Sequence, residues 1–180
     1  MVLPSNWYAL SIPEQLFVVA DLERTARGLP PYLGINVTLS AAAYRAAQTN
    51  SDPGLAPNFS YSVDPAGYPA MGGAWSGGFN VLAADYMWMY DDGWAGTLSA
   101  TSNIACTSAT TAGCWAHRDE LLGSDPAFNP GVGLTCTTCE MGVAFAIVAA
   151  SGSYVDLIER PAAKAPPMVF TWAQESAFTQ

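Results

Sequence analysis

One histidine, His117, is the side chain in this sequence best suited to transfer protons near neutral pH. It lies in the stretch Trp115–Leu122, directly before Arg118. An unperturbed imidazole has a pKa of about 6.5, so His117 is a candidate general base or substrate hydrogen-bond partner. Because the chain has no second histidine, any mechanism must combine His117 with carboxylates or hydroxyls. The alternative is a histidine at a helix end that only bonds a backbone carbonyl.

Carboxylates are the natural partners of this histidine. Glu23, Asp85, Glu120 and Glu140 lie on or beside predicted helices and strands, and two acids facing one cleft would form the pair that glycoside hydrolases use. Asp85 is preferred because it sits in an otherwise apolar helix, where burial would raise its pKa. The candidate catalytic residues are therefore His117, Asp85 and Glu120. The alternative for most of these acids is a solvated or paired surface position.

Aromatic side chains are concentrated between Trp75 and Trp115, and their flat faces suit sugar rings and other amphipathic ligands. Trp75 and Trp94, beside glycines in predicted loops, are expected to be exposed binding platforms. Trp88 and Trp115 are expected to fill the core.

Other chemistries find little support. Ser76 lacks the strand–turn–helix context of a nucleophile elbow. Asp91-Asp92-Gly93 lacks the ligand spacing of a calcium loop and is interpreted as a helix stop. Phosphate-loop and dinucleotide-binding patterns are absent from the sequence.

The four cysteines fall into two close pairs, Cys106 with Cys114 and Cys136 with Cys139. Local pairing is the simplest of the three possible arrangements, because each pair brackets a turn-like segment. The Cys136–Cys139 pair is also compatible with half of a zinc site or with a redox motif. Zinc would normally require two more nearby ligands, and a redox motif usually opens a helix after a strand. Two disulfides indicate an oxidising compartment, so we expect a secreted protein.

Composition limits the partners. The 180 residues fit one domain, and they carry a net charge of −9 with only 12% charged side chains. An acidic chain with six basic residues is not expected to bind nucleic acid or anionic membranes. No apolar run reaches the length of a membrane span. Met1–Ser5 lacks a signal-peptide pattern, so we interpret the sequence as a mature chain whose export signal is absent.

Four helices are predicted to position these groups, over residues 13–28, 38–49, 79–90 and 114–122. Pro13 suits a first helical turn and Gly28 ends the first helix. The second helix presents a stripe of small residues suited to close packing. The third carries Asp85 and the fourth carries His117.

Strands are predicted later in the chain. The apolar run 141–150, a turn at 151–153 and the alternating segment 154–158 predict a hairpin, and 168–172 predicts a further strand. The segment 50–78 is rich in Pro, Gly, Asn and Ser and is predicted to be a loop. Helices followed by strands favour an α+β sandwich in a single domain spanning 1–180.

Five segments, taken in order along residues 14–160, resemble the CAP superfamily, which comprises cysteine-rich secretory proteins, antigen 5 and pathogenesis-related 1 proteins. Within that superfamily, the chain resembles the bacterial secreted branch. The segments are Leu22–Pro31, Phe59–Gly67, Gly78–Ala83, Trp115–Leu122 and Met141–Ala144 with Tyr154-Val155. Residues 161–180 would form a strand and tail beyond this core.

The resemblance implies a three-layer α/β/α sandwich with a cleft that holds two histidines and two acids, a set able to bind a divalent metal. Only His117 matches that set. Tyr61 falls near the first histidine position, and Phe79 takes the place of the glutamate that precedes Asn80. One imidazole in an apolar cleft binds zinc poorly, so neither a metal nor another cofactor is expected.

The resemblance therefore predicts a secreted, extracellular CAP-like domain that binds a small-molecule, lipid or glycan ligand in a metal-free cleft. The expected ligand-binding residues are Asn80, Trp75, Trp94 and Tyr61. A second interpretation is a hydrolase acting on cell-wall or plant polysaccharide through Asp85 or Glu120 with His117. A third is an interaction scaffold with a vestigial cleft.

Overall fold

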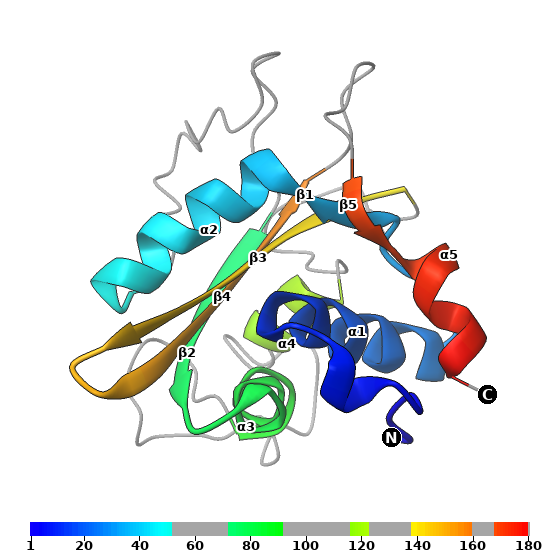
Figure 1. Cartoon of the computed structure of the whole chain (residues 1–180), viewed down its shortest axis with the longest axis horizontal. Helices are drawn as coiled ribbons and strands as arrows, with labels where there is room; N and C mark the ends of the chain where they lie inside the picture. The colour runs from blue at the N-terminus through cyan, green and yellow to red at the C-terminus, as the bar shows by residue number, and fades with distance from the viewer. Residues whose placement is uncertain (52–71, 92–115, 123–137, 160–167, 180) are drawn as a thin grey trace.

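Among the residues that the structure describes, a five-stranded mixed sheet forms the centre (Figure 1). The computed structural model describes residues 1–51, 72–91, 116–122, 138–159 and 168–179. The strand order is β2-β4-β3-β1-β5. These strands are β1 (Gly34–Asn36), β2 (Gly72–Gly78), β3 (Glu140–Val148), β4 (Ser151–Glu159) and β5 (Met168–Thr171). β1 runs parallel to β3, and the other neighbouring pairs are antiparallel.

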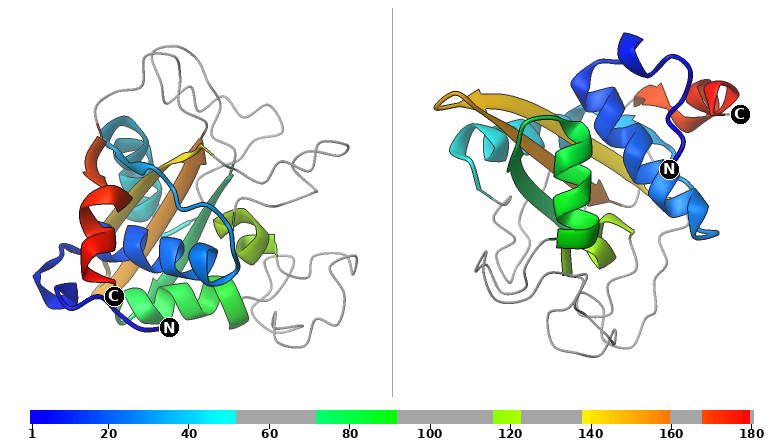
Figure 2. Two further views of the ribbon diagram at one scale, coloured as in Figure 1. Left: turned by 90° about the vertical axis from the view of Figure 1, so that its right-hand side faces the viewer. Right: turned by 90° about the horizontal axis from the view of Figure 1, so that it is seen from below.

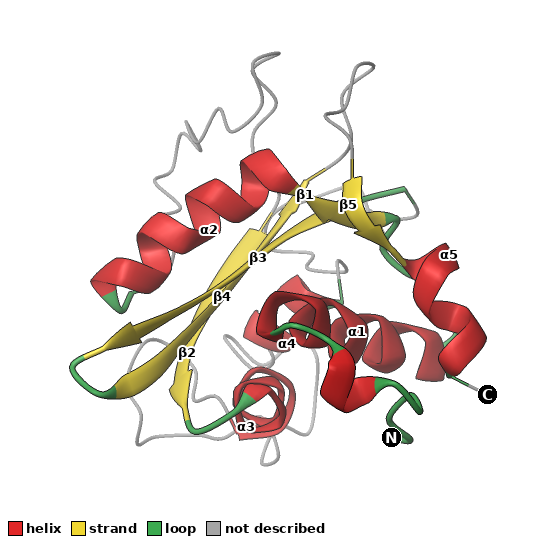
Figure 3. Cartoon of the chain, viewed as in Figure 1, coloured by secondary structure: helices red, strands yellow, loops and turns green. Residues whose placement is uncertain are grey.

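Helices cover both faces of this sheet (Figures 1 and 3). One face is packed by α2 (Val37–Thr49). The other is packed by α1 (Ile12–Ala26), α3 (Val81–Tyr86) and α4 (Ala116–Leu121), and α1 and α3 run side by side across it (Figure 2). The α+β class predicted from the sequence is confirmed.

Short helical segments complete the described residues. They are η1 (Trp7–Ala9), the π-helical turn η2 (Met87–Asp91) that continues α3, α5 (Trp172–Glu175) and η5 (Ser176–Phe178). In the parts of the chain that the structure describes, no helix has the length and apolarity to cross a membrane.

The side chains of β3 point alternately to the two faces of the sheet and so contribute to two separate core clusters. Met141 and Val143 belong to the cluster with α1, α3 and α4, whereas Ala144 belongs to the cluster with α2. Gly142 lies against α2, where a Cβ would be 2.3 Å from Cβ of Leu39. A side chain at this position would push the helix away, so glycine permits the close approach.

The buried Arg24 fixes α4 against α1. Its guanidinium lies 4.0 Å from the ring centroid of Tyr32, and it donates hydrogen bonds to the carbonyls of Pro30 and Leu122. The Tyr32 hydroxyl donates to the carbonyl of Leu121 at 2.8 Å. The bonds to Leu121 and Leu122 satisfy backbone carbonyls that would otherwise be unpaired at the end of α4.

Most predicted elements are confirmed: the helices correspond to α1, α2, α3 and α4, and the hairpin to β3 and β4. One prediction is wrong in part, because residues 72–78 of the expected loop form β2. Residues 52–71 lie outside the described residues. The hairpin turns at Ala149 and Ala150, which have positive φ, and 151–153 belong to β4.

Candidate functional site

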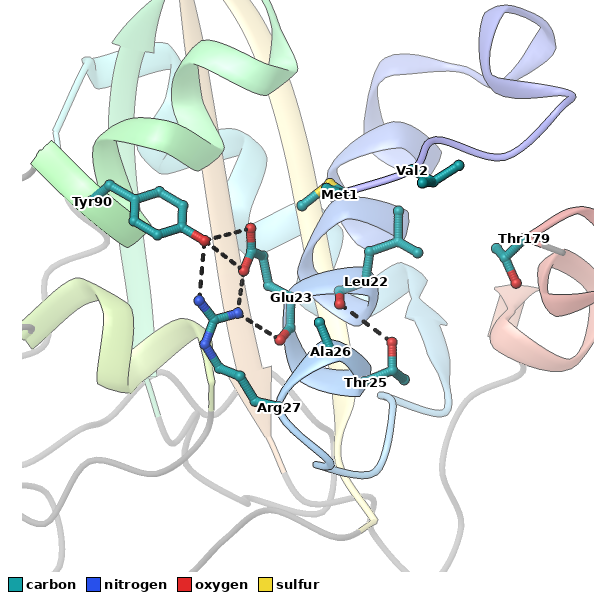
Figure 4. Close-up of a pocket in the computed structure, with 9 residues that line it drawn as sticks. All are labelled: Met1, Val2, Leu22, Glu23, Thr25, Ala26, Arg27, Tyr90 and Thr179. Carbon is teal, nitrogen blue, oxygen red and sulfur yellow. Dashed lines mark hydrogen bonds and ion pairs between the residues drawn. The ribbon is translucent and has the colours of Figure 1, made fainter.

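A carboxylate on α1 and a guanidinium on the residue that caps its end form the centre of the candidate site (Figure 4). Glu23 and Arg27 are one helical turn apart, the spacing at which side chains on one helix face meet. Arg27 Nη1 pairs with Glu23 Oε2 and also donates to the Glu23 backbone carbonyl at 2.8 Å. Glu23 is buried, at 5% exposure, and Arg27 is half-buried.

Tyr90, from the π-helical turn after α3, completes a triad with these two residues. Its hydroxyl lies 3.1 Å from Glu23 Oε1 and 3.0 Å from Glu23 Oε2, and it accepts a hydrogen bond from Arg27 Nη2 at 3.0 Å. The Glu23–Arg27–Tyr90 triad therefore joins α1 to the helix beside it. The triad therefore offers a ligand both hydrogen-bond donors and hydrogen-bond acceptors.

A second carboxyl group, that of Asp85, lies buried near the triad. The pKa of Asp85 is raised from 3.8 to about 7, mainly by burial and also by the negative charge of Glu23, while the positive charge of Arg27 opposes both. Its Oδ1 is buried and accepts no hydrogen bond from the described residues. Asp85 is therefore protonated below about pH 7, and the prediction that burial in an apolar helix raises its pKa is confirmed.

The charge of Arg27 is secured by the same contacts. Burial works against the cation, but hydrogen bonds to Tyr90 and Glu23 and the Glu23 charge outweigh it and raise the pKa of Arg27. The triad thus contains a permanent cation beside a buried carboxylate.

The triad forms the polar wall of an open pocket of about 630 Å³ (Figure 4). Hydrogen bonds from Ser5 N to the Phe178 carbonyl (3.1 Å) and from Asn6 Nδ2 to Glu175 Oε2 (2.9 Å) bring both ends of the described chain together there. The rest of the lining mixes apolar side chains with two hydroxyls: Met1, Val2, Leu22, Ala26, Thr25 and Thr179. Such a lining suits an amphipathic ligand.

The predicted catalytic residues are not placed together at this pocket. Asp85 is buried beside the triad but does not line the pocket. Glu120 on α4 is buried against Gly72, where a Cβ would come within 2.6 Å of its Cγ. His117 is half-buried on the same helix, and both residues have interaction partners. A catalytic role for His117 with Glu120 stays a prediction.

The predicted ligand-binding residues have varied positions. Asn80 is exposed and caps α3, accepting a hydrogen bond from Ala83 N at 2.9 Å. The expectation of a loop platform is wrong for Trp75, which lies in β2, packs against the α2 cluster and donates to Ser153 Oγ at 2.9 Å. Tyr61 and Trp94 lie outside the described residues.

Of the residues predicted to fill the core or to form disulfides, some lie within the described residues and others do not. Trp88 is in the core at 1% exposure, as predicted, while Trp115 lies outside the described residues. Cys139 is fully buried. Cys106, Cys114 and Cys136 lie outside the described residues, so the pairing stays a prediction.

Arg27 and Tyr90 were not predicted as site residues, and Glu23 was considered only as one acid among several. The contact between Glu23 and Arg27 could have been predicted, since the two residues have the four-residue spacing of helical ion pairs. Nothing in the sequence indicates that Tyr90 meets them across 67 positions. No group of three or more potential metal ligands occurs among the described residues.

Comparison with known proteins returned no matching family model, curated protein or solved structure.

Proposed function

We propose that this chain is an extracellular CAP-like domain that binds a neutral carbohydrate at the pocket beside Glu23, Arg27 and Tyr90. The observation that carries the proposal is the Glu23–Arg27–Tyr90 triad, which forms one wall of an open, half-apolar pocket. Sugar rings combine hydroxyls with apolar faces, and this lining offers partners for both.

Charge favours a neutral ligand over an anionic one. The Arg27 cation is matched by the Glu23 carboxylate, and the whole chain carries a net charge of −9. An acidic ligand would be repelled by the chain and would compete with Glu23 for Arg27. A hydroxyl can instead donate to the carboxylate or accept from the guanidinium. The hydrogen bonds of Arg27 to described residues use three of its five N–H groups, which leaves two for a ligand.

Support for the CAP-like assignment comes from the layered arrangement. One helix packs on one face of the sheet and three pack on the other, the order of layers that the resemblance implies. The low content of charged residues and the two close pairs of cysteines along the sequence support an extracellular location.

The test is titration calorimetry with neutral mono- and disaccharides of glucose and N-acetylglucosamine. Ala26→Trp places a large ring at an exposed position in the pocket lining and should weaken binding at least roughly tenfold. Ala41→Trp, at an exposed position of α2 on the opposite face, is the matched control. Equal affinities for the two variants would exclude this pocket.

His117→Ala separates this pocket from a site on α4. We expect His117→Ala to retain binding if the triad holds the sugar. Loss of binding in His117→Ala but not in Ala26→Trp would transfer the site to α4. Absence of binding to every sugar tested would favour the scaffold interpretation.

Acid–base hydrolysis is a second candidate, favoured by the closeness of Glu23 and Asp85. Because Asp85 is buried behind the pocket wall, this mechanism requires a substrate that reaches it past Glu23. A carboxyl whose pKa is raised to about 7 beside a second carboxyl has the environment of a general acid. Release of reducing ends from neutral polysaccharides should then fall as pH rises through about 7, as Asp85 loses its proton. Asp85→Asn should abolish that release and leave sugar binding intact. Release by Asp85→Asn at the wild-type rate would exclude this mechanism.

A further inference from the structure

An exposed row of large apolar side chains leads along α3 toward the pocket. Phe79, just before the helix, is 100% exposed, and Leu82 and Tyr86 are 40% and 48% exposed. Exposed apolar side chains that are close together along one short segment, unlike scattered ones, indicate a site of interaction. We refer to Phe79, Leu82 and Tyr86 as the aromatic row.

The aromatic row is continuous with the pocket. Leu82 and Tyr86 are one turn of α3 apart, which places them on the same side of the helix, and Tyr90 follows in the π-helical turn. The rings of Tyr86 and Tyr90 are in contact, with centroids 5.9 Å apart and planes tilted by 35°. The Tyr90 hydroxyl in turn belongs to the pocket wall.

We propose that the aromatic row is a second carbohydrate subsite, on which further rings of the same neutral glycan chain lie. This inference rests on the function proposed above, because the row extends from the same pocket. Exposed aromatic faces are suited to the apolar faces of sugar rings.

Polar groups along the row favour a glycan over an acyl chain. The amide of Asn80, next to Phe79, uses its oxygen to cap α3 and keeps its N–H groups free of hydrogen bonds to the described residues. An acyl chain would use neither this amide nor the donors and acceptors of the triad. The segment Val81–Asp91 contains no basic residue, so an acidic polysaccharide would find no counter-charge along it.

The experiment compares affinity for a neutral disaccharide and a hexasaccharide of the same sugar. Wild-type protein should bind the hexasaccharide roughly tenfold more tightly, because only the longer chain reaches the row. Phe79→Ser and Tyr86→Ser should each reduce this gain while leaving disaccharide affinity unchanged. Tyr44→Ser, at a 47% exposed tyrosine on α2, is the matched control and should retain the full gain.

The outcomes distinguish this inference from the function on which it depends. If the disaccharide binds but the hexasaccharide binds no more tightly, or if the row variants keep the gain, the second subsite is excluded and the pocket stands. If neither sugar binds, both proposals are excluded. If the row variants change molecular mass by light scattering and leave sugar affinity unchanged, the row is an interface between copies of the chain and the subsite is overturned.

Discussion

The hydroxyl of Tyr90 lies 3.1 and 3.0 Å from the two carboxylate oxygens of Glu23, although 67 positions separate the residues. This contact joins α1 to the π-helical turn that follows α3. Because Glu23 is buried at 5% exposure, its carboxylate depends on such donors more than a surface acid would. The Glu23–Arg27–Tyr90 triad therefore lines the pocket and also holds the two helical segments together.

Removing this hydroxyl should destabilise the fold. Tyr90→Phe leaves the buried carboxylate of Glu23 with one donor fewer, and we expect a loss of about 1–2 kcal/mol in the free energy of unfolding by urea. Tyr86→Phe removes the hydroxyl of a 48% exposed ring and should change stability by less than about 0.5 kcal/mol. Equal losses in both variants would show that the Tyr90 hydroxyl is not structurally important.

The stability of the protein should depend on the titration of Asp85. The native pKa is about 7, above the ordinary value of 3.8, so between these values the native state binds more protons than the unfolded state. Stability is therefore greatest below about pH 4 with respect to this group and decreases as pH rises toward 7, by up to about 4 kcal/mol.

Asp85→Asn should remove that dependence, because an amide stays neutral throughout. We expect the variant to gain stability over the wild type as pH rises from 4 to 8, measured by urea midpoints at each pH. Parallel pH profiles for the two proteins would contradict the raised pKa. A constant loss in the variant would instead report strain at the introduced amide.

Replacing the buried Arg24 should be strongly destabilising. Arg24→Met leaves the carbonyls of Pro30 and Leu122 without their donor and removes the cation over Tyr32. We expect a loss of about 3 kcal/mol or more in chemical unfolding. Arg45→Met, at an exposed position of α2, should cost less than about 0.5 kcal/mol. A small effect of Arg24→Met would mean that other groups replace its bonds.

The close approach of α2 to β3 can be tested with a single methyl group. Gly142→Ala places Cβ 2.3 Å from Leu39 Cβ and 2.4 Å from its backbone carbon, and we expect a loss of about 1–3 kcal/mol. Gly78→Ala, also in a strand, meets its nearest atom at 3.6 Å and should be nearly neutral. A thermal shift of the same size in both variants would rule out helix–sheet crowding as the cause.

Helices were well predicted because their ends are encoded locally. Ser11 and Glu14 form a capping box at the start of α1, and Gly28 at φ 73° follows its end. β2 was missed because four glycines in seven residues carry little strand propensity. Its structure comes from pairing with β4, from Gly72 opposite Ile158 to Gly78 opposite Gly152.

The site was only partly predictable for a similar reason. Asp85 could be identified from its apolar neighbours in the sequence, because burial of an acid changes its pKa whatever packs on it. Tyr90 could not be connected to Glu23, since that contact depends on how two helices are placed side by side. Trp75 was misassigned because the strand in which it lies was not recognised.

The buried bond from Asn36 Nδ2 to Glu140 Oε2, 2.8 Å long, spans 104 positions of the chain. The β3–β4 hairpin pairs residues that are close in sequence, but β1 finds its parallel partner only once β3 exists. A growing polypeptide that ends before residue 140 therefore has no central strand on which its first two helices can pack. Resistance to proteolysis during synthesis should thus arise late and abruptly, when the β3–β4 hairpin emerges.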